Sequence, residues 1–281
     1  MKTMPELPEV ETVRTALEAV VTGQKVEKLH LRRPDLRWPF PAGLAERVSG
    51  QIMGRPQRRG KYILLPAGET GSLLLHLGMS GAVRICETPA DSGLSDLGPH
   101  DHVIMQLASQ HSWIFCDPRR FGHLDWVPAG EETRHWLLRE MGVEPLSNRF
   151  SAALLQQLMA GRKSPVKTAL LDQRLIAGLG NIYVSEALFR AGISPRRKAA
   201  SIGPQRAQRL ASAIRQVLLE AIEQGGTSLR DHRQPNGEIG YFVQKLKVYG
   251  KKDAPCPACA TPIRMLRQSS RSGFYCPSCQ R

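Results

Sequence analysis

The sequence lacks an apolar run long enough to cross a lipid bilayer. The SLLLHLGM stretch at residues 72–79 is among the longest runs, far below the ~20 apolar residues that a spanning helix needs. Residues 1–30 carry acids and no apolar core, unlike a secretory signal. No G-K-[S/T] tripeptide follows a glycine run, which argues against a nucleoside triphosphatase, and no internal repeat is visible. These absences predict a cytoplasmic globular protein without a membrane partner.

Acidic residues are also in short supply. The 281-residue chain has 25 Asp and Glu against 39 Lys and Arg, giving a formal charge of +14 and a pI near 9.9. A surplus of this size favours a polyanionic partner, nucleic acid first and an acidic membrane second. The alternative is a solvated basic surface without a specific partner. With 41% hydrophobic residues, the composition is typical of a globular protein with one large or two ordinary domains.

Cysteines are few and unevenly placed. Four of the six lie in the last 26 residues as C-x-x-C, sixteen residues, C-x-x-C: Cys256, Cys259, Cys276 and Cys279. Two such turns facing each other present four thiolates to one ion, so the spacing predicts one structural Zn²⁺ in a zinc-ribbon hairpin. The alternative is a pair of redox dithiols. Cys86 and Cys116 lie in strand-like runs and are expected to be buried structural thiols.

The order of the elements predicts an α+β multidomain protein. Apolar residues at helical spacing predict a helix over residues 5–23. Six short apolar runs separated by turn residues then predict an antiparallel sandwich or barrel: KYILLP, SLLLHLG, GAVRIC, HVIMQLA, SWIFCD and GHLDWV. Helical patterns follow at 151–161, 181–192 and 204–226, and a polar loop from Gly225 to Phe242. We expect domains at 1–133, 134–245 and 246–281.

The AGLGNIY stretch resembles a glycine-rich phosphate loop. It fails the dinucleotide fingerprint because Tyr183 occupies the place of the third glycine. What remains is a tight turn into a helix whose N-terminus could anchor a phosphate, with Asn181 as its cap. A turn without any ligand is an equally good interpretation.

Several polar insertions among the strands have two interpretations. His100 and His102 favour phosphate or turn roles over metal binding, since no carboxylate–histidine spacing supports a metal site. By pattern alone, Met79 is a core or turn methionine. Arg58, Arg59 and Lys61 precede an apolar strand, where they either protect a sheet edge or contact an anion.

Taken together, these motifs resemble one family. MPELPEVET, GKYILL, HLGMSGAVRI, PHDHV, DPRRFG, GLGNIYVSEALFRAGI, VYGK and the four-cysteine ribbon occur in this order over almost the whole chain. The chain is similar to the formamidopyrimidine-DNA glycosylases, bacterial base-excision repair enzymes that remove oxidised purines such as 8-oxoguanine. The resemblance implies an N-terminal β-sandwich with flanking helices, a helix–two-turn–helix domain and a C-terminal zinc finger.

The resemblance also implies residue roles. It makes Pro5 the nucleophile, Glu6 the proton donor, Lys61 the lysine of β-elimination and Arg271 the zinc-finger arginine that grips phosphate and serves δ-elimination. It further implies a set of DNA-contacting residues: His100, Arg119, Arg162 and Asn181. Met79, Arg119 and Phe121 match the side chains that fill the gap left by a flipped base.

The implied chemistry needs a free proline amine. We therefore expect Met4 to be the natural start and residues 1–3 to be an extension, since Lys2 is too large for removal of a preceding methionine. The amine would form an imine with the sugar without any catalytic metal or organic cofactor. The partner implied is damaged double-stranded DNA at the bacterial nucleoid, without a nucleotide cofactor, bound by a monomer.

Two rival hypotheses stay open. One is a zinc-containing DNA-binding protein that does not cleave, and the other is an enzyme that prefers oxidised pyrimidines. Substrate choice would depend on the pocket and on the loop from Gly225 to about Lys247. One local departure is Ala260, where the first cysteine turn usually prefers glycine, so some backbone strain is expected there.

Overall fold

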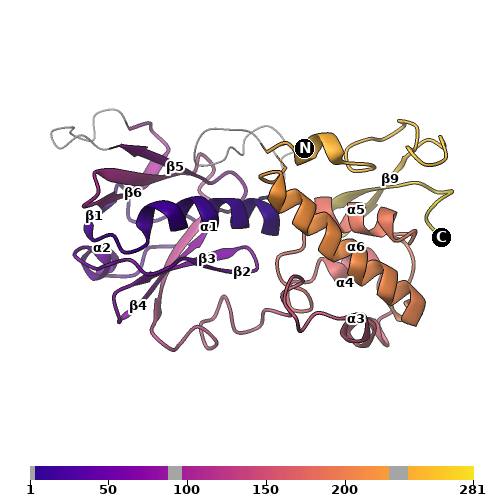
Figure 1. Ribbon diagram of the computed structural model, residues 1–281, viewed down its shortest axis with the longest axis horizontal. Coiled ribbons are helices and arrows are strands. Elements are labelled where there is room, and N and C mark those ends of the chain that lie inside the picture. Colours follow the sequence, from indigo (N-terminus) through magenta and orange to yellow (C-terminus); the bar gives the residue numbers. More distant parts are fainter. Residues whose placement is uncertain (1–3, 88–96, 228–239) are drawn as a thin grey trace. The chain divides into compact units, whose positions relative to one another are not determined.

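The structure is a computed structural model that describes residues 4–87, 97–227 and 240–281 (Figure 1). It divides into two compact units. One unit comprises Met1–Arg139 with Gly225–Tyr241, and the other comprises Glu140–Gln224 with Phe242–Arg281. Most of the loop predicted from Gly225 to Phe242 lies outside the described residues.

The first unit is a β-sandwich, as the sequence predicted. Its two four-stranded antiparallel sheets have the strand orders β1-β6-β7-β5 and β2-β3-β4-β8. The strands are β1 Val26–Leu31, β2 Gln57–Arg59, β3 Tyr62–Ala67, β4 Gly71–His76, β5 Ala82–Glu87, β6 Asp101–Leu107, β7 His111–Cys116 and β8 His123–Pro128. All six apolar runs named from the sequence became strands.

One contiguous core lies between the two sheets. Alternate residues of each strand point into it, as the two-residue period of a strand requires. From one sheet come Val103, Met105, Trp113 and Phe115; from the other come Ile63, Leu65, Leu73 and Leu75. The inward faces of both sheets therefore share a single apolar layer.

Helix α1, Leu7–Val21, covers part of this unit and contacts β2 and β3 (Figure 1). Its buried face consists of Val10, Val13, Leu17 and Val21, a helical spacing that joins the sandwich core. Pro8 lies in the first turn, where a missing N–H costs nothing. The Glu9 carboxylate accepts the backbone N–H of Glu6 at 2.9 Å and so caps the N-terminus of the helix.

Three short elements of this unit were not predicted. In β1 the apolar residues are interrupted by Glu27, Lys28 and His30, β2 is only the triplet QRR, and α2 is one short turn at Leu44–Val48. β2 exists because it pairs with β3, with Arg59 opposite Tyr62. No apolar pattern marks such a strand, since its stability comes from its partner.

The second unit begins with helices. They are α3 Ala152–Met159, α4 Val166–Leu170, α5 Asn181–Arg190 and α6 Pro204–Glu223, with short 3-10 turns at Ala199–Ser201 and Phe242–Lys245. The Ser151 hydroxyl caps α3 by accepting the Leu154 N–H at 3.1 Å. α4 was not predicted, because five residues carry too little periodicity.

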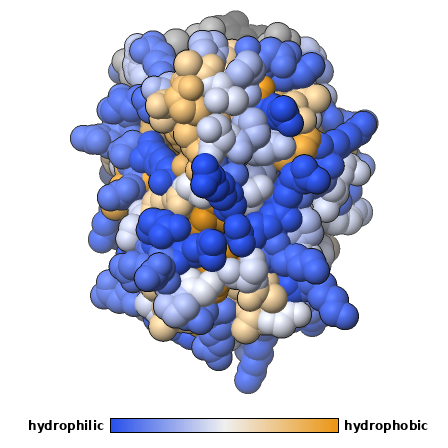
Figure 2. All heavy atoms as spheres, turned by 90° about the vertical axis from the view of Figure 1, so that its right-hand side faces the viewer, coloured by the Kyte–Doolittle hydropathy of each residue, from blue (hydrophilic) through white to orange (hydrophobic). Residues whose placement is uncertain are grey.

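Helix α6 packs against α3 and α5. Its apolar stripe at helical spacing is completely buried: Ala207, Leu210, Ile214, Val217 and Ala221. Most of its exposed residues are polar, and Figure 2 shows a largely hydrophilic face. Among the described residues, no helix is both long and apolar enough to span a bilayer.

A two-stranded antiparallel hairpin completes the second unit. β9, Arg264–Gln268, and β10, Arg271–Tyr275, pair with Gln268 opposite Arg271. Ser269 and Ser270 form the turn with φ values of 47° and 63°. Two positive φ angles are typical of the tight hairpin turn whose twist matches that of the strands. The hairpin contacts α5 through β10.

The sandwich core makes one prediction about stability. Leu17 is completely buried, so Leu17→Ala should leave a cavity and lower the free energy of unfolding by about 2–5 kcal/mol. The same substitution at Leu219, whose side chain is 57% exposed on α6, should cost less than about 1 kcal/mol. Urea unfolding monitored by circular dichroism measures both. Equal losses would contradict the assignment of Leu17 to the core.

Candidate functional site

The strand registers of the first unit bring two loops to one end of the second sheet. β4 ends at His76, which is the register partner of His123 at the start of β8. Loop 77–81 leaves β4 at this end, and loop 117–122 enters β8 at the same end. Met79 and the Arg119–Phe121 segment are therefore neighbours in space although about 40 residues separate them in sequence.

A third loop reaches the same end through the other sheet. Cys116, the last residue of β7, pairs with Ala82 at the start of β5 and with Asp101 at the start of β6. His100 directly precedes β6, and its carbonyl accepts the Asp117 N–H at 2.9 Å. The PHDH and DPRRFG motifs thus lie side by side, which sequence spacing alone could not establish.

The three predicted gap-filling side chains differ in exposure. Phe121 is 42% exposed, whereas Met79 and Arg119 are half-buried. The Arg119 guanidinium lies over the Phe121 ring at 4.9 Å from its centroid, a distance that allows cation–π attraction. An exposed aromatic ring beside a cation is suited to stacking against bases and contacting phosphates.

Lys61 lies in the two-residue turn between β2 and β3. Arg58 braces this turn: its Nε donates to Glu11 of α1 at 2.7 Å and its terminal nitrogen donates to the Gly60 carbonyl at 3.1 Å. Arg58 is thus ion-paired with α1 and is no simple edge-protecting charge. The pairing places the first half of α1 beside the turn that carries Lys61.

Pro5 and Glu6 directly precede α1 and are buried. Glu9 fixes this stretch from two sides. Its Oε2 accepts the Glu6 N–H at 2.9 Å, and its Oε1 accepts the Thr227 N–H at 2.7 Å. The predicted nucleophile and proton donor are thereby tied to the edge of the Gly225–Phe242 loop.

His76 is a titratable group that the sequence argument missed. Its Nδ1 accepts the Gly78 N–H at 3.0 Å, and its ring lies 4.7 Å from that of Tyr62. Burial, reinforced by the nearby Lys61 charge, lowers the pKa of His76 to about 3. The imidazole is therefore neutral at physiological pH, with Nδ1 unprotonated. A histidine at the end of a buried strand gave no motif by which to find it.

The remaining predicted DNA-contacting residues belong to the second unit. Arg162 is exposed after α3, and Arg271 is exposed at the start of β10. Asn181 is the first residue of α5, and the cap position belongs to Gly180. The prediction that Asn181 caps the helix is therefore wrong. Its amide is used elsewhere, because Nδ2 donates to the Ser272 carbonyl at 2.8 Å.

The Ser272 carbonyl is a junction between the helices and the hairpin. Besides Asn181, the Lys167 ammonium donates to it at 3.3 Å, from a side chain that is almost fully buried. A β-carbon at position 273 would lie 2.7 Å from the Lys167 Nζ, so a larger residue there would displace the Lys167 ammonium. These contacts hold the backbone directly after Arg271 in one orientation.

A second buried carboxylate organises the segment before the hairpin. Glu186 of α5 is completely buried. Its oxygens accept the backbone N–H groups of Lys247, Val248 and Tyr249 at 2.9–3.0 Å. The VYGK motif is thus held against α5 by one side chain. Helical periodicity alone cannot distinguish Glu186 from any other buried residue of the helix.

The four predicted cysteines form one cluster. Their sulfur atoms all lie within 4.8 Å of one another, with Sγ–Sγ distances of 3.9 Å for Cys256–Cys279 and 3.5 Å for Cys259–Cys276. Four ligands at ~2.3 Å in a tetrahedron stand about 3.8 Å apart. The cluster therefore fits one structural zinc ion, and its closed set of four thiolates has no place for a substrate.

The turn after Cys259 bears out the expected strain. Ala260 has φ = 58°, and its N–H donates to the Cys256 carbonyl at 2.9 Å. A β-carbon in this left-handed region costs on the order of 1 kcal/mol relative to glycine. The turn keeps its shape despite this cost.

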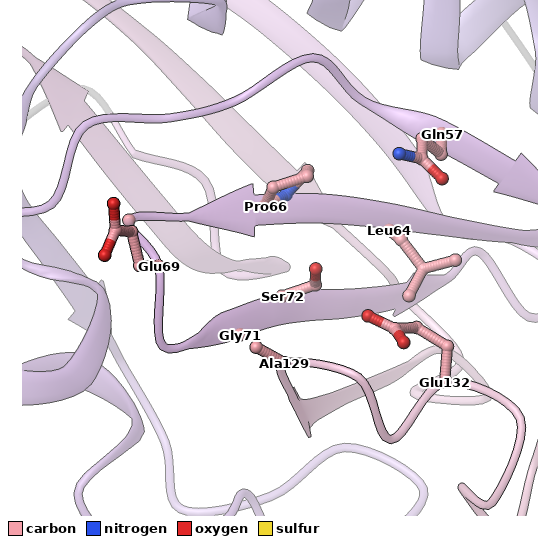
Figure 3. A pocket seen from close by; sticks show the side chains of 9 residues that line it. Gln57, Leu64, Pro66, Glu69, Gly71, Ser72, Ala129 and Glu132 are labelled. Carbon is pink, nitrogen blue, oxygen red and sulfur yellow. The ribbon is translucent and has the colours of Figure 1, made fainter.

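A hollow in the first unit has no part in this arrangement. It has a volume of about 200 Å³ and lies over β2, β3 and β4 (Figure 3). Its polar lining includes Gln57, Ser72 and the carboxyl groups of Glu69 and Glu132. Acidic walls repel phosphate, so the hollow is a poor candidate for a polyanion site.

The zinc cluster makes a prediction about metal content. Cys276→Ser removes one of four ligands and should lose the single zinc ion, because a structural site depends on its full ligand set. Cys86→Ser, which alters a cysteine of β5 outside the cluster, should retain it. Native mass spectrometry counts the metal. One retained zinc in Cys276→Ser would remove this assignment.

The neutral state of His76 makes a prediction about pH. The folded chain takes up this proton only near pH 3, whereas the unfolded chain takes it up near 6.5. Stability is therefore lost as pH falls from 6.5 towards 3. Between pH 7.5 and 5 the contribution is at most about 2 kcal/mol. His76→Gln should flatten this part of the urea-unfolding profile, and an unchanged slope would contradict the assignment.

The comparisons with known families cover nearly the whole chain. The profile of the formamidopyrimidine-DNA glycosylase N-terminal domain matches residues 4–124, and that of the formamidopyrimidine-DNA glycosylase H2TH domain matches residues 141–233. The zinc finger found in FPG and IleRS matches residues 254–281. Each match falls on a part with the fold that the sequence predicted.

Individual relatives agree. The formamidopyrimidine-DNA glycosylase of Jannaschia sp. (strain CCS1) is 50% identical, covering 99% of this chain and all of its own. The MutM (Fpg) protein of Thermus thermophilus is 39% identical with a TM-score of 0.86, covering 98% of both chains. The Lactococcus lactis Fpg mutant G226P, solved with Fapy-dG-containing DNA, is 32% identical with a TM-score of 0.89, covering 99% of this chain and all of its own. The chain therefore belongs to the formamidopyrimidine-DNA glycosylase family.

Proposed function

We propose that the protein is a bifunctional DNA glycosylase and AP lyase that removes oxidised purines from double-stranded DNA. The observation that carries the proposal is the convergence of three loops at one end of the sandwich. They bring the predicted gap-filling side chains and His100 together. Loops with exposed aromatic and cationic side chains on a rigid sheet scaffold suit the recognition of a distorted duplex.

The first step of the proposed reaction is extrusion of the damaged nucleotide. A base stacked in a duplex cannot be reached, so the nucleotide is flipped out and the gap is refilled by protein side chains. Met79, Arg119 and Phe121 are assigned to the gap. The pairing of Arg119 with the Phe121 ring supports a joint role, since one offers charge and the other a stacking surface.

Pro5 is assigned as the nucleophile. A free α-amine titrates near 7.7–8.0, so much of it is neutral at physiological pH and can attack the sugar carbon that bears the base. The base leaves, and the amine and sugar form an iminium ion. The iminium then accepts the electrons released when the neighbouring sugar proton is removed, which breaks the strand by β-elimination.

Neighbouring groups are assigned to the proton transfers. Glu6 adjoins the amine and can pass a proton to the sugar oxygen. Lys61 is assigned to β-elimination, and the brace that Arg58 provides for its turn supports a fixed position. The neutral imidazole of His76 beside this turn would accept or donate a hydrogen bond without adding charge.

The second unit is assigned to the phosphate backbone. DNA phosphates would be contacted by Arg271, Arg162 and Asn181. Such contacts position a duplex without reading its sequence. The zinc cluster stabilises the hairpin that carries Arg271, and the Ser272 junction fixes the backbone beside it. Arg271 would also serve δ-elimination. The surplus of positive charge supports binding to a long polyanion.

The proposal also includes a partner, a cellular compartment and a division into domains. The proposed partner is damaged duplex DNA, bound by a monomer without a nucleotide cofactor. A four-thiolate zinc site favours the reducing cytoplasm, where the nucleoid lies. We keep the division into domains at 1–133, 134–245 and 246–281 as part of this proposal.

The proposed mechanism predicts covalent trapping that depends on the N-terminus. A protein beginning at Pro5 should be trapped as a covalent adduct on a duplex that contains 8-oxoguanine when borohydride reduces the imine to an amine. A protein that keeps residues 1–4 should form none, because the lone pair of an amide nitrogen is delocalised into its carbonyl. Glu6→Gln in the Pro5 form should slow base excision about 100-fold or more, because the proton donor is lost. Denaturing gel electrophoresis measures adduct and strand cleavage.

Each alternative has its own outcome in this experiment. Equal trapping by the form with residues 1–4 would make another amine the nucleophile, with Lys61 first. Binding of the lesion by the Pro5 form without an adduct or cleavage would favour a non-catalytic DNA-binding protein. An adduct formed only with an oxidised-pyrimidine duplex would favour the pyrimidine-directed enzyme.

A further inference from the structure

Asp117 is a completely buried carboxyl group that the proposed reaction leaves without a role. It stands at the start of the DPRRFG motif, directly after β7 and two residues before Arg119. A buried carboxyl group is costly unless its oxygens are hydrogen-bonded. Its partners therefore indicate what the residue does.

Each carboxylate oxygen of Asp117 binds a different loop. Oδ1 accepts the Ser80 hydroxyl at 2.6 Å, and Ser80 directly follows Met79. Oδ2 accepts the Gly122 N–H at 2.6 Å, and Gly122 directly follows Phe121. One side chain thus fixes the positions adjoining two of the three proposed gap-filling residues.

The backbone of Asp117 holds further parts of the same region. Its carbonyl accepts the Arg120 N–H at 3.1 Å and the His102 Nε2 at 3.0 Å, while its N–H donates to the His100 carbonyl at 2.9 Å. The Ser80 hydroxyl in turn accepts the Arg119 N–H at 3.3 Å. All three loops at this end of the sandwich are therefore connected through Asp117.

The loops 77–81 and 117–122, which carry the proposed gap-filling residues, are closely packed against each other. A β-carbon on Gly78 would stand 2.3 Å from the Phe121 backbone carbon, so the two backbones are in direct contact. Arg120 has φ = 56°, a left-handed conformation that is unfavourable without glycine. The Asp117 contacts at both sides of this turn provide a physical reason for its persistence.

We propose that Asp117 is the positioning residue that holds Met79 and Phe121 in a preformed arrangement for insertion into a DNA duplex. This inference rests on the proposed function. A preformed arrangement matters because gap filling must offset unstacking of the duplex, and ordering the side chains during binding would reduce affinity. Asp117 acts through the two loops and does not itself contact DNA.

Asp117→Asn is the sharpest test. The amide keeps the size and one acceptor oxygen, but the NH₂ group that replaces the other oxygen donates and cannot accept, so the side chain can no longer accept from both Ser80 and Gly122. In the Pro5 form, the variant should bind a duplex with a tetrahydrofuran abasic analogue about tenfold more weakly. Its affinity for the undamaged duplex should change less than about twofold. A 2-aminopurine opposite the analogue should report altered stacking.

The chemical step provides an internal control. Imine trapping on an abasic site in single-stranded DNA requires no gap filling, so Asp117→Asn should trap at the rate of the unaltered protein within about twofold. Asp125→Asn changes a second carboxylate of the same unit, which is only partly buried and contacts Trp126, Trp136, His123 and His135 but neither loop. It should bind the abasic analogue normally.

The outcomes separate the two proposals. Failure of the unaltered Pro5 form to trap any abasic substrate would overturn the proposed function. Normal trapping by that form, together with unchanged duplex affinity and 2-aminopurine signal in Asp117→Asn, would overturn the positioning role alone. Equal loss on single-stranded and duplex substrates would also overturn it, because that pattern indicates general damage to the fold. Thermal unfolding of each variant identifies such damage directly.

Discussion

The register of the antiparallel strands is the constraint on which the first unit depends. A shift of one residue between β4 and β8 would turn every side chain of one strand to the opposite face. The shared core prevents such a shift, because Leu75 and Leu124, which are opposite each other, are both completely buried. The same register fixes where loops 77–81 and 117–122 emerge. The position of the candidate DNA-contacting loops is therefore determined by apolar packing that contacts no DNA.

Buried carboxylates make the finer adjustments. Glu9 and Glu186 accept backbone N–H groups from segments distant in sequence, and Asp117 accepts the hydroxyl of the distant Ser80 together with the N–H of the nearby Gly122. A carboxylate offers two acceptor oxygens on a short side chain, so one residue can bind two strands of backbone at once. Removing one would leave several buried donors without partners, which costs more than the loss of a single hydrogen bond. The protein thus organises irregular loops with acids although its net charge is strongly positive.

The sequence predicted the regular elements well and the contacts between them poorly. Apolar periodicity located α1, α6 and six of the eight sandwich strands, because burial of one face is visible in the pattern. The cysteine spacing predicted the metal cluster, because ligand geometry is local. The sequence could not predict that the Asn181 side chain donates to the Ser272 carbonyl, since that contact joins positions 91 residues apart. Periodicity likewise marks Glu186 and His76 only as positions within an element, and β2 has no pattern of its own.

The contact of Glu9 with Thr227 has a consequence for how the chain is made. The two residues are 218 positions apart, yet both belong to the first unit. A ribosome releases the N-terminal strands long before residue 227 has been synthesised, and domains usually fold as they emerge. The sandwich can collapse at that stage, but the start of α1 lacks one of its two partners. The end that bears Pro5 and Glu6 is therefore completed late in translation, after all eight strands of the sandwich have been made.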